Sequence, residues 1–139
     1  MRFNKILCID DDTTIHFLNR IHIEDLDLSS NYIELLNGDE GIAYFEALTN
    51  KNDSEIEVPE LLLLDINMPV MDGWEFLQKL NDNYAQLATK IKIYIITSSL
   101  KPSDKELAKV TKNVSGFFEK PLDEEQFKEI IKDFERDAK

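Results

Sequence analysis

Short apolar runs alternate with amphipathic stretches along the whole chain, and this alternation predicts the order of the secondary-structure elements. Five runs of strand length predict strands at Lys5–Ile9, Tyr32–Leu36, Leu61–Leu64, Ile91–Ile96 and Gly116–Glu119. The stretches between them predict helices at Thr13–Glu24, Glu40–Leu48 and Gly73–Tyr84, a fourth helix beginning near Ser103 and a fifth after Asp123. Strict alternation of this kind is typical of a doubly wound α/β domain, whose parallel sheet is covered by helices on both faces.

Individual residues indicate where helices begin and which side chains they bury. Ser103 and Glu106 have the spacing of a capping box, and Asp123 is expected to be the N-cap of the last helix. The polar segment Asn50–Pro59 predicts a surface loop. The predicted inward-facing side chains are Ile15, Leu18 and Ile21 in the first helix, Phe76, Leu77 and Leu80 in the third, Leu107 and Val110 in the fourth, and Phe127, Ile130, Ile131 and Phe134 in the last.

Composition narrows the class of protein. A length of 139 residues fits one domain, expected to span residues 1–139, and the 19 residues after Lys120 suffice for a last helix but not for a second domain. The formal charge of −12 argues against nucleic-acid binding, and no apolar run approaches the roughly 18 residues of a membrane span. We expect a cytoplasmic protein, since no signal-peptide pattern is seen, with the lone Cys8 buried as a small apolar side chain.

Polar residues gather where the predicted strands end. Asp10–Asp12 follow the first strand, Asp65 the third and Thr97–Ser99 the fourth, and Lys120 follows the fifth. Taken singly, these residues could be a helix N-cap, a turn residue, a strand end and a surface lysine. Together they fall at the same end of their strands, where ligands bind in doubly wound sheets.

Converging carboxylates need a cation. Two carboxylates about 4 Å apart repel by roughly 4 kcal/mol at an effective dielectric constant of about 20. A cluster of carboxylate oxygens without His or Cys suits Mg²⁺, which also accepts phosphate oxygens, while Lys120 and the Thr97 hydroxyl complement a phosphoryl group. A carboxylate can also act as a nucleophile, so the residue types and their placement suggest phosphoryl transfer.

Three segments carry a resemblance to a known family. Residues 61–73, LLLLDINMPVMDG, closely resemble the phosphoacceptor region of the receiver domains of bacterial two-component response regulators. Residues 5–12, KILCIDDD, resemble their first strand with its acidic pair, and residues 117–121, FFEKP, their fifth strand with its lysine. The resemblance covers essentially the whole chain and implies a flavodoxin-like (βα)5 fold with strand order 2-1-3-4-5.

The resemblance also implies roles for individual residues. Asp65 would be the phosphoacceptor, and Asp11, Asp65 and the backbone carbonyl of Asn67 would bind Mg²⁺, with Asp10 helping through water. Thr97 and Lys120 would contact the phosphoryl group, Asn67 and Ser99 would tune its lifetime, and Thr97 and Phe117 would form the switch. Ser98 would be the small residue beside the site, whereas Asp12 lies beyond the matched pair and is expected to be an N-cap.

The resemblance further implies partners. A sensor histidine kinase or a histidine phosphotransfer protein would donate the phosphoryl group, and a downstream protein would read the face made by the fourth helix, fifth strand and fifth helix. Such a chain is a phosphoacceptor signalling domain rather than an enzyme, although it assists its own phosphorylation and dephosphorylation.

Two other functions remain open from the sequence. Asp10-x-Asp12-x-Thr14 also resembles the first motif of haloacid-dehalogenase-type phosphatases, in which Asp10 would be the nucleophile and Asp12 the general acid. That hypothesis leaves the residues around Asp65 unexplained. The other alternative, a degenerate receiver that only binds partners, is disfavoured because every chemical position is filled.

Two further side chains are expected to have structural roles only. His16 suggests a phosphohistidine carrier, but nothing else in the sequence supports that function, so we expect a surface or partly buried position. Trp74 is expected to pack at the start of the third helix.

Overall fold

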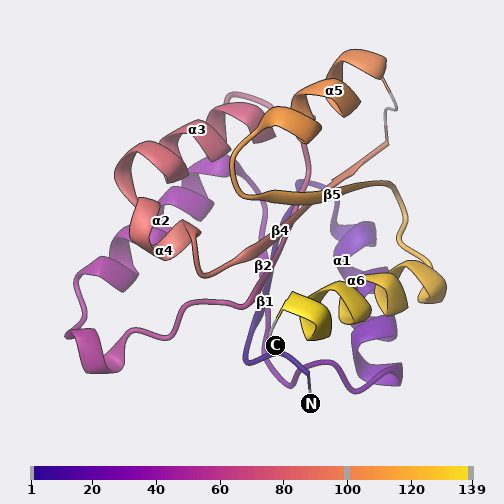
Figure 1. Cartoon of the computed structure of the whole chain (residues 1–139), viewed down its shortest axis with the longest axis horizontal. Coiled ribbons are helices and arrows are strands. Elements are labelled where there is room, and N and C mark those ends of the chain that lie inside the picture. Colours follow the sequence, from indigo (N-terminus) through magenta and orange to yellow (C-terminus); the bar gives the residue numbers. More distant parts are fainter. Residues whose placement is uncertain (1, 99–100, 138–139) are drawn as a thin grey trace.

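The computed structural model describes residues 2–98 and 101–137, and in these residues the five strands are separated by helical segments, as the sequence predicts (Figure 1). The strands are β1 (Ile6–Ile9), β2 (Tyr32–Leu35), β3 (Leu61–Leu64), β4 (Lys92–Thr97) and β5 (Val114–Glu119). The helices are α1 (Thr13–Asp25), α2 (Gly38–Thr49), α3 (Gly73–Asn83), α4 (Ala85–Ala88), α5 (Pro102–Val110) and α6 (Glu124–Asp137), and a short 3₁₀ helix (Asp53–Glu55) lies between α2 and β3.

The strands form one parallel sheet in the order β2-β1-β3-β4-β5, which confirms the expected flavodoxin-like order 2-1-3-4-5. Strand β3 lies at the centre, between β1 and β4, and all four of its leucines are buried. Because the chain passes from β1 to β2 on one side and from β3 to β4 on the other, the strand order switches direction between β1 and β3. The carboxyl ends of these two central strands therefore face the crevice in which such sheets bind ligands.

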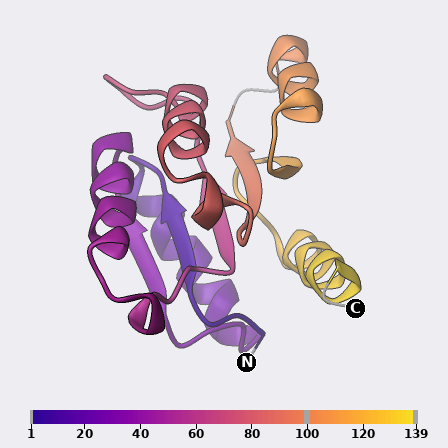
Figure 2. The same cartoon turned by 60° about the vertical axis from the view of Figure 1, so that its left-hand side comes forward.

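Helices cover both faces of the sheet (Figures 1 and 2). Alternate side chains of β1, β3 and β4 point to opposite faces, so each strand contributes to two apolar clusters. One cluster joins the sheet to α2, α3 and α4 through Phe45, Phe76, Leu77, Leu80 and Leu87. The other joins it to α1 and α6 through Ile23, Phe127 and Ile130.

The structure corrects the predicted inner faces of two helices. In α1 the buried residues are Ile15, His16, Asn19 and Ile23, whereas Ile21 is exposed. In α5 only Ala108 is buried, and Leu107 and Val110 are exposed. Apolar spacing does not predict the buried face of either helix. In α1, polar side chains find partners inside the protein and are buried. Helix α5 covers only the margin of the sheet, so Leu107 and Val110 stay exposed.

The expected helix starts are right in α6 and wrong in α5. The Asp123 carboxylate accepts a hydrogen bond from the Gln126 amide at 2.8 Å, as an N-cap does. Helix α5 instead begins at Pro102 after Lys101, which makes no side-chain cap, so the predicted Ser103–Glu106 capping box is wrong. Proline at the first position starts the helix by itself, since its fixed φ suits the first turn and it has no amide to satisfy.

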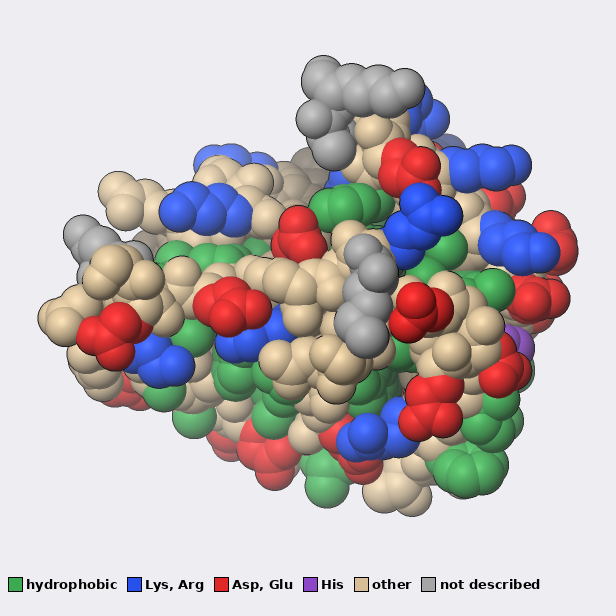
Figure 3. Space-filling view, turned by 90° about the horizontal axis from the view of Figure 1, so that it is seen from below, with side chains coloured by type: hydrophobic (Ala, Val, Ile, Leu, Met, Phe, Trp, Pro, Cys, Tyr) green, Lys and Arg blue, Asp and Glu red, His purple; other side chains and the backbone are tan. Residues whose placement is uncertain are grey.

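The sequence pattern does not predict α4, a single turn of helix directly after α3. The predicted fourth and fifth helices are therefore α5 and α6. None of the helices within the described residues combines the length and apolarity required to span a bilayer. On the face in Figure 3, acidic and basic side chains are interspersed; the expectation that the chain does not bind nucleic acid stays a prediction.

Candidate functional site

Three carboxylates meet at the carboxyl ends of β1 and β3. Oxygen atoms of Asp10, Asp11 and Asp65 all lie within 4.8 Å of one another. Asp10 and Asp65 are buried, at 1% and 2% exposure, while Asp11 is exposed and opens the cluster to solvent. The two strands bring them together because β1 and β3 are hydrogen-bonded neighbours, with Ile9 opposite Leu64, so the residue after each strand reaches the same edge.

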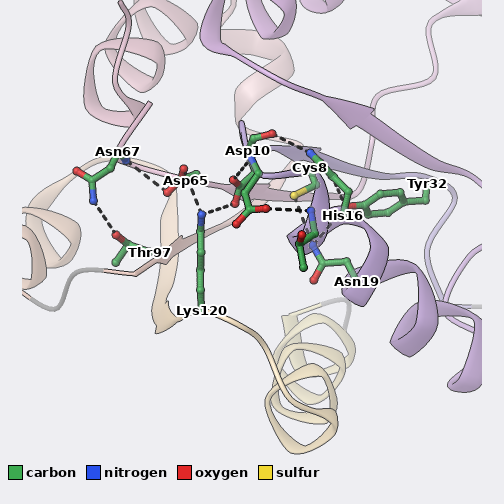
Figure 4. A network of polar contacts seen from close by, with 11 residues as sticks. Cys8, Asp10, His16, Asn19, Tyr32, Asp65, Asn67, Thr97 and Lys120 are labelled. Atoms are coloured by element: carbon green, nitrogen blue, oxygen red, sulfur yellow. Dashed lines mark hydrogen bonds and ion pairs between the residues drawn. The ribbon is translucent and has the colours of Figure 1, made fainter. Parts of the chain in front are cut away.

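Lys120, directly after β5, provides the positive charge of the cluster. Its Nζ lies 2.7 Å from Oδ2 of Asp10 and 3.3 Å from Oδ2 of Asp65 (Figure 4). The Lys120 amide donates to the Thr97 carbonyl at 2.9 Å, which ties this residue to the end of β4. Three carboxylates and one ammonium group leave a formal charge of −2, so the donor set fits a hard divalent cation bound by oxygen atoms.

The loop between β3 and α3 holds Asp65 in place. Oδ1 of Asp65 accepts from the Asn67 amide at 3.3 Å, and the Gly73 amide donates to the Ile66 carbonyl at 2.8 Å. A capping box between Asp72 and Glu75 starts α3 at the end of this loop. Val70, at the loop tip, is 94% exposed and has a φ of 71°, a left-handed conformation that is costly for a β-branched side chain. The loop therefore has a defined shape rather than a relaxed one.

Thr97 and Asn67 lie beside the cluster. Thr97 is fully buried at the end of β4, and its Oγ1 accepts from Nδ2 of Asn67 at 3.3 Å (Figure 4). The Asn67 side chain is exposed, so its side-chain amide is accessible to a ligand. The metal-binding role expected for the Asn67 carbonyl stays a prediction. Ser98 is exposed beside Thr97, and Ser99, predicted to tune phosphate lifetime, lies outside the described residues.

Phe117 lies away from the cluster, on β5 opposite Ile95 of β4. Its ring is partly buried against the apolar cluster of α2 and α3. It also lines a groove of about 480 Å³ between α5 and β5, together with Lys105, Ala108, Lys109, Val114, Ser115 and Gly116. The ring thus has a half-buried position, with space on its open side.

Burial and neighbouring charges shift the pKa values of Asp65 and Lys120. Burial, followed by the nearby charge of Asp10, raises the pKa of Asp65 from 3.8 to about 6, although Lys120 opposes the shift. Burial alone would lower the pKa of Lys120, but hydrogen bonds and charges of Asp10 and Asp65 raise it, so this residue stays protonated. The site therefore carries excess negative charge that the lysine only partly offsets.

The raised pKa of Asp65 predicts how stability depends on pH in metal-free protein. Between pH 4 and 6 the folded chain binds this proton more tightly than the unfolded chain, so the free energy of unfolding falls as pH rises. A shift from 3.8 to about 6 corresponds to roughly 3 kcal/mol. Relative to wild type, Asp65→Asn should therefore gain stability from pH 4 to pH 7 in urea denaturation with a chelator present. Parallel stability curves for the two proteins would contradict this prediction.

Three residues have the structural roles expected of them. The Asp12 side chain accepts from the Thr14 amide at 2.9 Å and caps α1, as predicted. Cys8 is buried in β1. Trp74 lies at the start of α3, as expected, but its Nε1 also donates to Asp104 of α5 at 3.1 Å, a link that no sequence pattern indicated.

The expectation for His16 is wrong. This side chain is only 1% exposed, and both of its ring nitrogens have partners. Its spacing from Ile15 and Asn19 on α1 could not reveal this, because the partners come from the end of β1 and from β2. The only local signal for a buried His16 is that it lies on α1 six residues after Asp10, the residue that follows β1.

Comparisons with known proteins agree with this geometry. A family model, the response regulator receiver domain, matches residues 6–132. This chain belongs to that family. A two-component response regulator from Cytophaga hutchinsonii has the same fold, with a TM-score of 0.88 and 24% identity over 98% of this chain and 99% of that one. A two-component response regulator from Legionella pneumophila has a TM-score of 0.74 and 27% identity over 96% of this chain and 98% of that one.

A curated relative covers a longer protein. The probable C4-dicarboxylate response regulator DctR of Halalkalibacterium halodurans is 30% identical to this receiver domain over 80 residues, which are 58% of this chain and 31% of that protein. The alignment thus spans about a third of the relative's length. The phosphatase alternative finds no support, because Asp12, its general acid, caps α1 and the family match assigns the chain to the receiver domains.

Proposed function

We propose that this receiver domain accepts a phosphoryl group on Asp65, in a Mg²⁺-dependent reaction, from a sensor histidine kinase or a histidine phosphotransfer protein. The supporting observation is the convergence of Asp10, Asp11 and Asp65 with Lys120 at one edge of the sheet. The chain acts in this proposal as a phosphoacceptor rather than as an enzyme with a separate substrate. Because phosphohistidine donors are made from ATP, the proposal places the reaction in the cytoplasm.

Each residue of the cluster has a chemical task. A carboxylate oxygen of Asp65 attacks the phosphorus in line, a P–O bond forms, the P–N bond of the phosphohistidine breaks, and imidazole leaves. Lys120 pairs with the phosphoryl oxygens, and the Thr97 hydroxyl and Asn67 amide offer further hydrogen bonds. Mg²⁺ would be held by Asp11, Asp65 and the backbone carbonyl of Asn67, with Asp10 helping through water, and would neutralise the charge shared by the carboxylates and the phosphoryl oxygens.

Mapping the phosphate tests this proposal. Wild-type protein incubated with acetyl phosphate and Mg²⁺ should gain one hydroxylamine-labile phosphate, and chelation of the metal should prevent it. Borohydride reduction converts an aspartyl phosphate to homoserine, which mass spectrometry can locate after trypsin digestion. Asp65 and Asp10 fall in different tryptic peptides, residues 52–79 and 6–20. Homoserine at Asp10, in the peptide of residues 6–20, would refute the receiver chemistry and favour the phosphatase alternative.

The proposal includes an output surface on α5, β5 and α6. The groove beside Phe117 is lined by the apolar residues Ala108 and Val114 and by two lysines, Lys105 and Lys109. When a phosphoryl group of about −2 charge draws the Thr97 hydroxyl toward it, that hydroxyl leaves Asn67 and frees space beneath β4. The half-buried ring of Phe117 could then turn inward and gain on the order of 1–3 kcal/mol. A downstream protein would read the changed surface.

The switch proposal predicts that Phe117→Ala keeps phosphorylation at Asp65 but weakens the conformational response. The test compares NMR spectra of both proteins with and without beryllofluoride, a phosphoryl mimic. Smaller shifts across residues 101–134 in the variant are expected, because alanine gains little from burial. Equal shifts in the two proteins would mean that Phe117 is only a core residue.

A further inference from the structure

A buried polar chain extends inward from the acidic cluster, and His16 lies at its centre. Nε2 of His16 is 2.9 Å from the backbone carbonyl of Asp10, and Nδ1 is 2.8 Å from the Tyr32 hydroxyl (Figure 4). That hydroxyl also accepts from Nδ2 of Asn19 at 3.2 Å. The chain connects α1 and β2 to the residue that follows β1, and none of its members belongs to the proposed phosphoryl chemistry except Asp10.

The partners determine the direction of these hydrogen bonds. A carbonyl oxygen can only accept, so Nε2 of His16 carries the hydrogen and donates to Asp10. In a neutral imidazole Nδ1 is then an acceptor, which receives the Tyr32 O–H. Burial, then the neighbouring Cys8, raises the pKa of Tyr32, so this hydroxyl keeps its proton. The result is one continuous order, with Tyr32 donating to His16 and His16 donating to Asp10.

The carbonyl that His16 holds belongs to the peptide unit between Asp10 and Asp11. Because β1 ends at Ile9 and α1 begins at Thr13, this unit lies outside the regular hydrogen bonds of both elements. A peptide unit is planar, so fixing its carbonyl fixes ψ of Asp10 and φ of Asp11 together. Those two angles set the directions in which both carboxylates leave the backbone.

Other contacts restrain Asp10 but not this plane. The Asp10 amide donates to the Leu35 carbonyl at 3.0 Å, and Oδ1 of Asp10 accepts from the Asp12 amide at 2.9 Å. Among the described residues, no hydrogen bond or ion pair holds the exposed Asp11 side chain, so its direction depends on the peptide unit before it. Ligands that are preset in direction bind a metal more tightly, because less ordering is needed when the ion arrives.

We infer that His16 is a positioning residue, whose Nε2–H holds the Asp10–Asp11 peptide unit and thereby aims both carboxylates for the cation. This inference rests on the proposed binding of Mg²⁺ at the acidic cluster. His16 touches neither the cation nor the phosphoryl group; it acts through the backbone of Asp10.

Substitution of His16 by glutamine or by asparagine distinguishes the loss of the hydrogen-bond donor from the loss of the imidazole ring. In His16→Gln the side-chain NH₂ reaches the place of Nε2 and can still donate to the Asp10 carbonyl. In His16→Asn the NH₂ lies nearer the place of Nδ1 and leaves that carbonyl without its donor. Calorimetric titration with Mg²⁺ should show binding roughly 10-fold weaker in His16→Asn, as for other residues that orient metal ligands, and within about threefold of wild type in His16→Gln.

A control addresses general loss of stability. Ile130→Ala removes buried apolar atoms from α6 on the same face of the sheet, and Ile130 is not a member of the acidic cluster or of the polar chain around His16. It should lower the midpoint of thermal unfolding and leave Mg²⁺ affinity unchanged. Equal Mg²⁺ affinity in wild type, His16→Asn and Ile130→Ala would overturn the inference while leaving the proposed function intact. Failure of wild type itself to bind Mg²⁺ would overturn both.

A second measurement needs no substitution. In ¹⁵N-labelled wild type without metal, His16 should give the NMR signature of the neutral Nε2–H tautomer, with slow exchange of that hydrogen. Addition of Mg²⁺ should shift the Nε2–H signal along the same titration curve as the calorimetry. A proton found on Nδ1, or an Nε2–H signal unmoved by saturating Mg²⁺, would overturn the inference even if His16→Asn failed to fold.

Discussion

Asp65→Asn is expected to abolish acid-stable phosphate incorporation from acetyl phosphate at saturating Mg²⁺. The amide has nearly the shape of the carboxylate, so the fold and the contact with the Asn67 amide can be kept. It lacks the negatively charged oxygen that attacks phosphorus, and it removes one of three acidic groups from the cluster. Intact mass spectrometry of protein treated in parallel with wild type is the direct measurement.

The matched control is Asp12→Asn. Asp12 lies two residues from Asp10, but its side chain caps α1, and asparagine is an equally good N-cap. The substitution therefore removes the same charge from the same region without removing a residue of the proposed chemistry. Full labelling of Asp12→Asn beside unlabelled Asp65→Asn is expected. Labelled Asp65→Asn, or loss of label in Asp12→Asn alone, would refute Asp65 as the acceptor.

Gly73→Ala is expected to cost about 3 kcal/mol of stability or more, and to weaken Mg²⁺ binding as well. A Cβ at position 73 would lie 2.5 Å from the Asp65 carbonyl oxygen and 2.9 Å from Cα of Ile66. Both are backbone atoms of the loop that holds Asp65, so neither can move aside as a side chain would. Relief of the clash must displace the start of α3 or the loop, and either shift moves the Asp65 carboxylate.

Gly38→Ala provides the comparison for this prediction. Its Cβ would meet Sδ of Met71 at 2.6 Å, an equally short contact, but with a flexible side chain that can change rotamer. A loss of about 1 kcal/mol at most is expected, with unchanged Mg²⁺ affinity. Urea denaturation and metal titration of both variants provide the measurements. Equal losses of stability in the two variants would show that contact with backbone atoms at Gly73 costs no more than contact with a side chain at Gly38.

Sequence pattern alone determined the order of the elements and most of the site. Leu61–Leu64 is apolar without interruption, and a run of this length suits a strand buried on both faces, which is where β3 lies. Parallel strands end at the same edge, so Asp10, Asp65 and Lys120 could be brought together from the succession of strands, and the structure confirms their contact. Local rules also sufficed for Asp12 and Asp123, because an N-cap bonds within its own first turn.

Only the tertiary structure decided what depends on neighbours distant in sequence. Helical spacing predicts that Ile21 faces the core, yet α1 buries His16 and Asn19 instead. Both side chains form hydrogen bonds with the Tyr32 hydroxyl on β2. Trp74 and Asp104 likewise meet only because α3 and α5 lie side by side. A polar side chain is costly inside a protein unless a partner is present, and no count of residues along the chain reveals that partner. The members of the acidic cluster could thus be named from the sequence, whereas the contacts of His16 and Asn19 with Tyr32 required the fold.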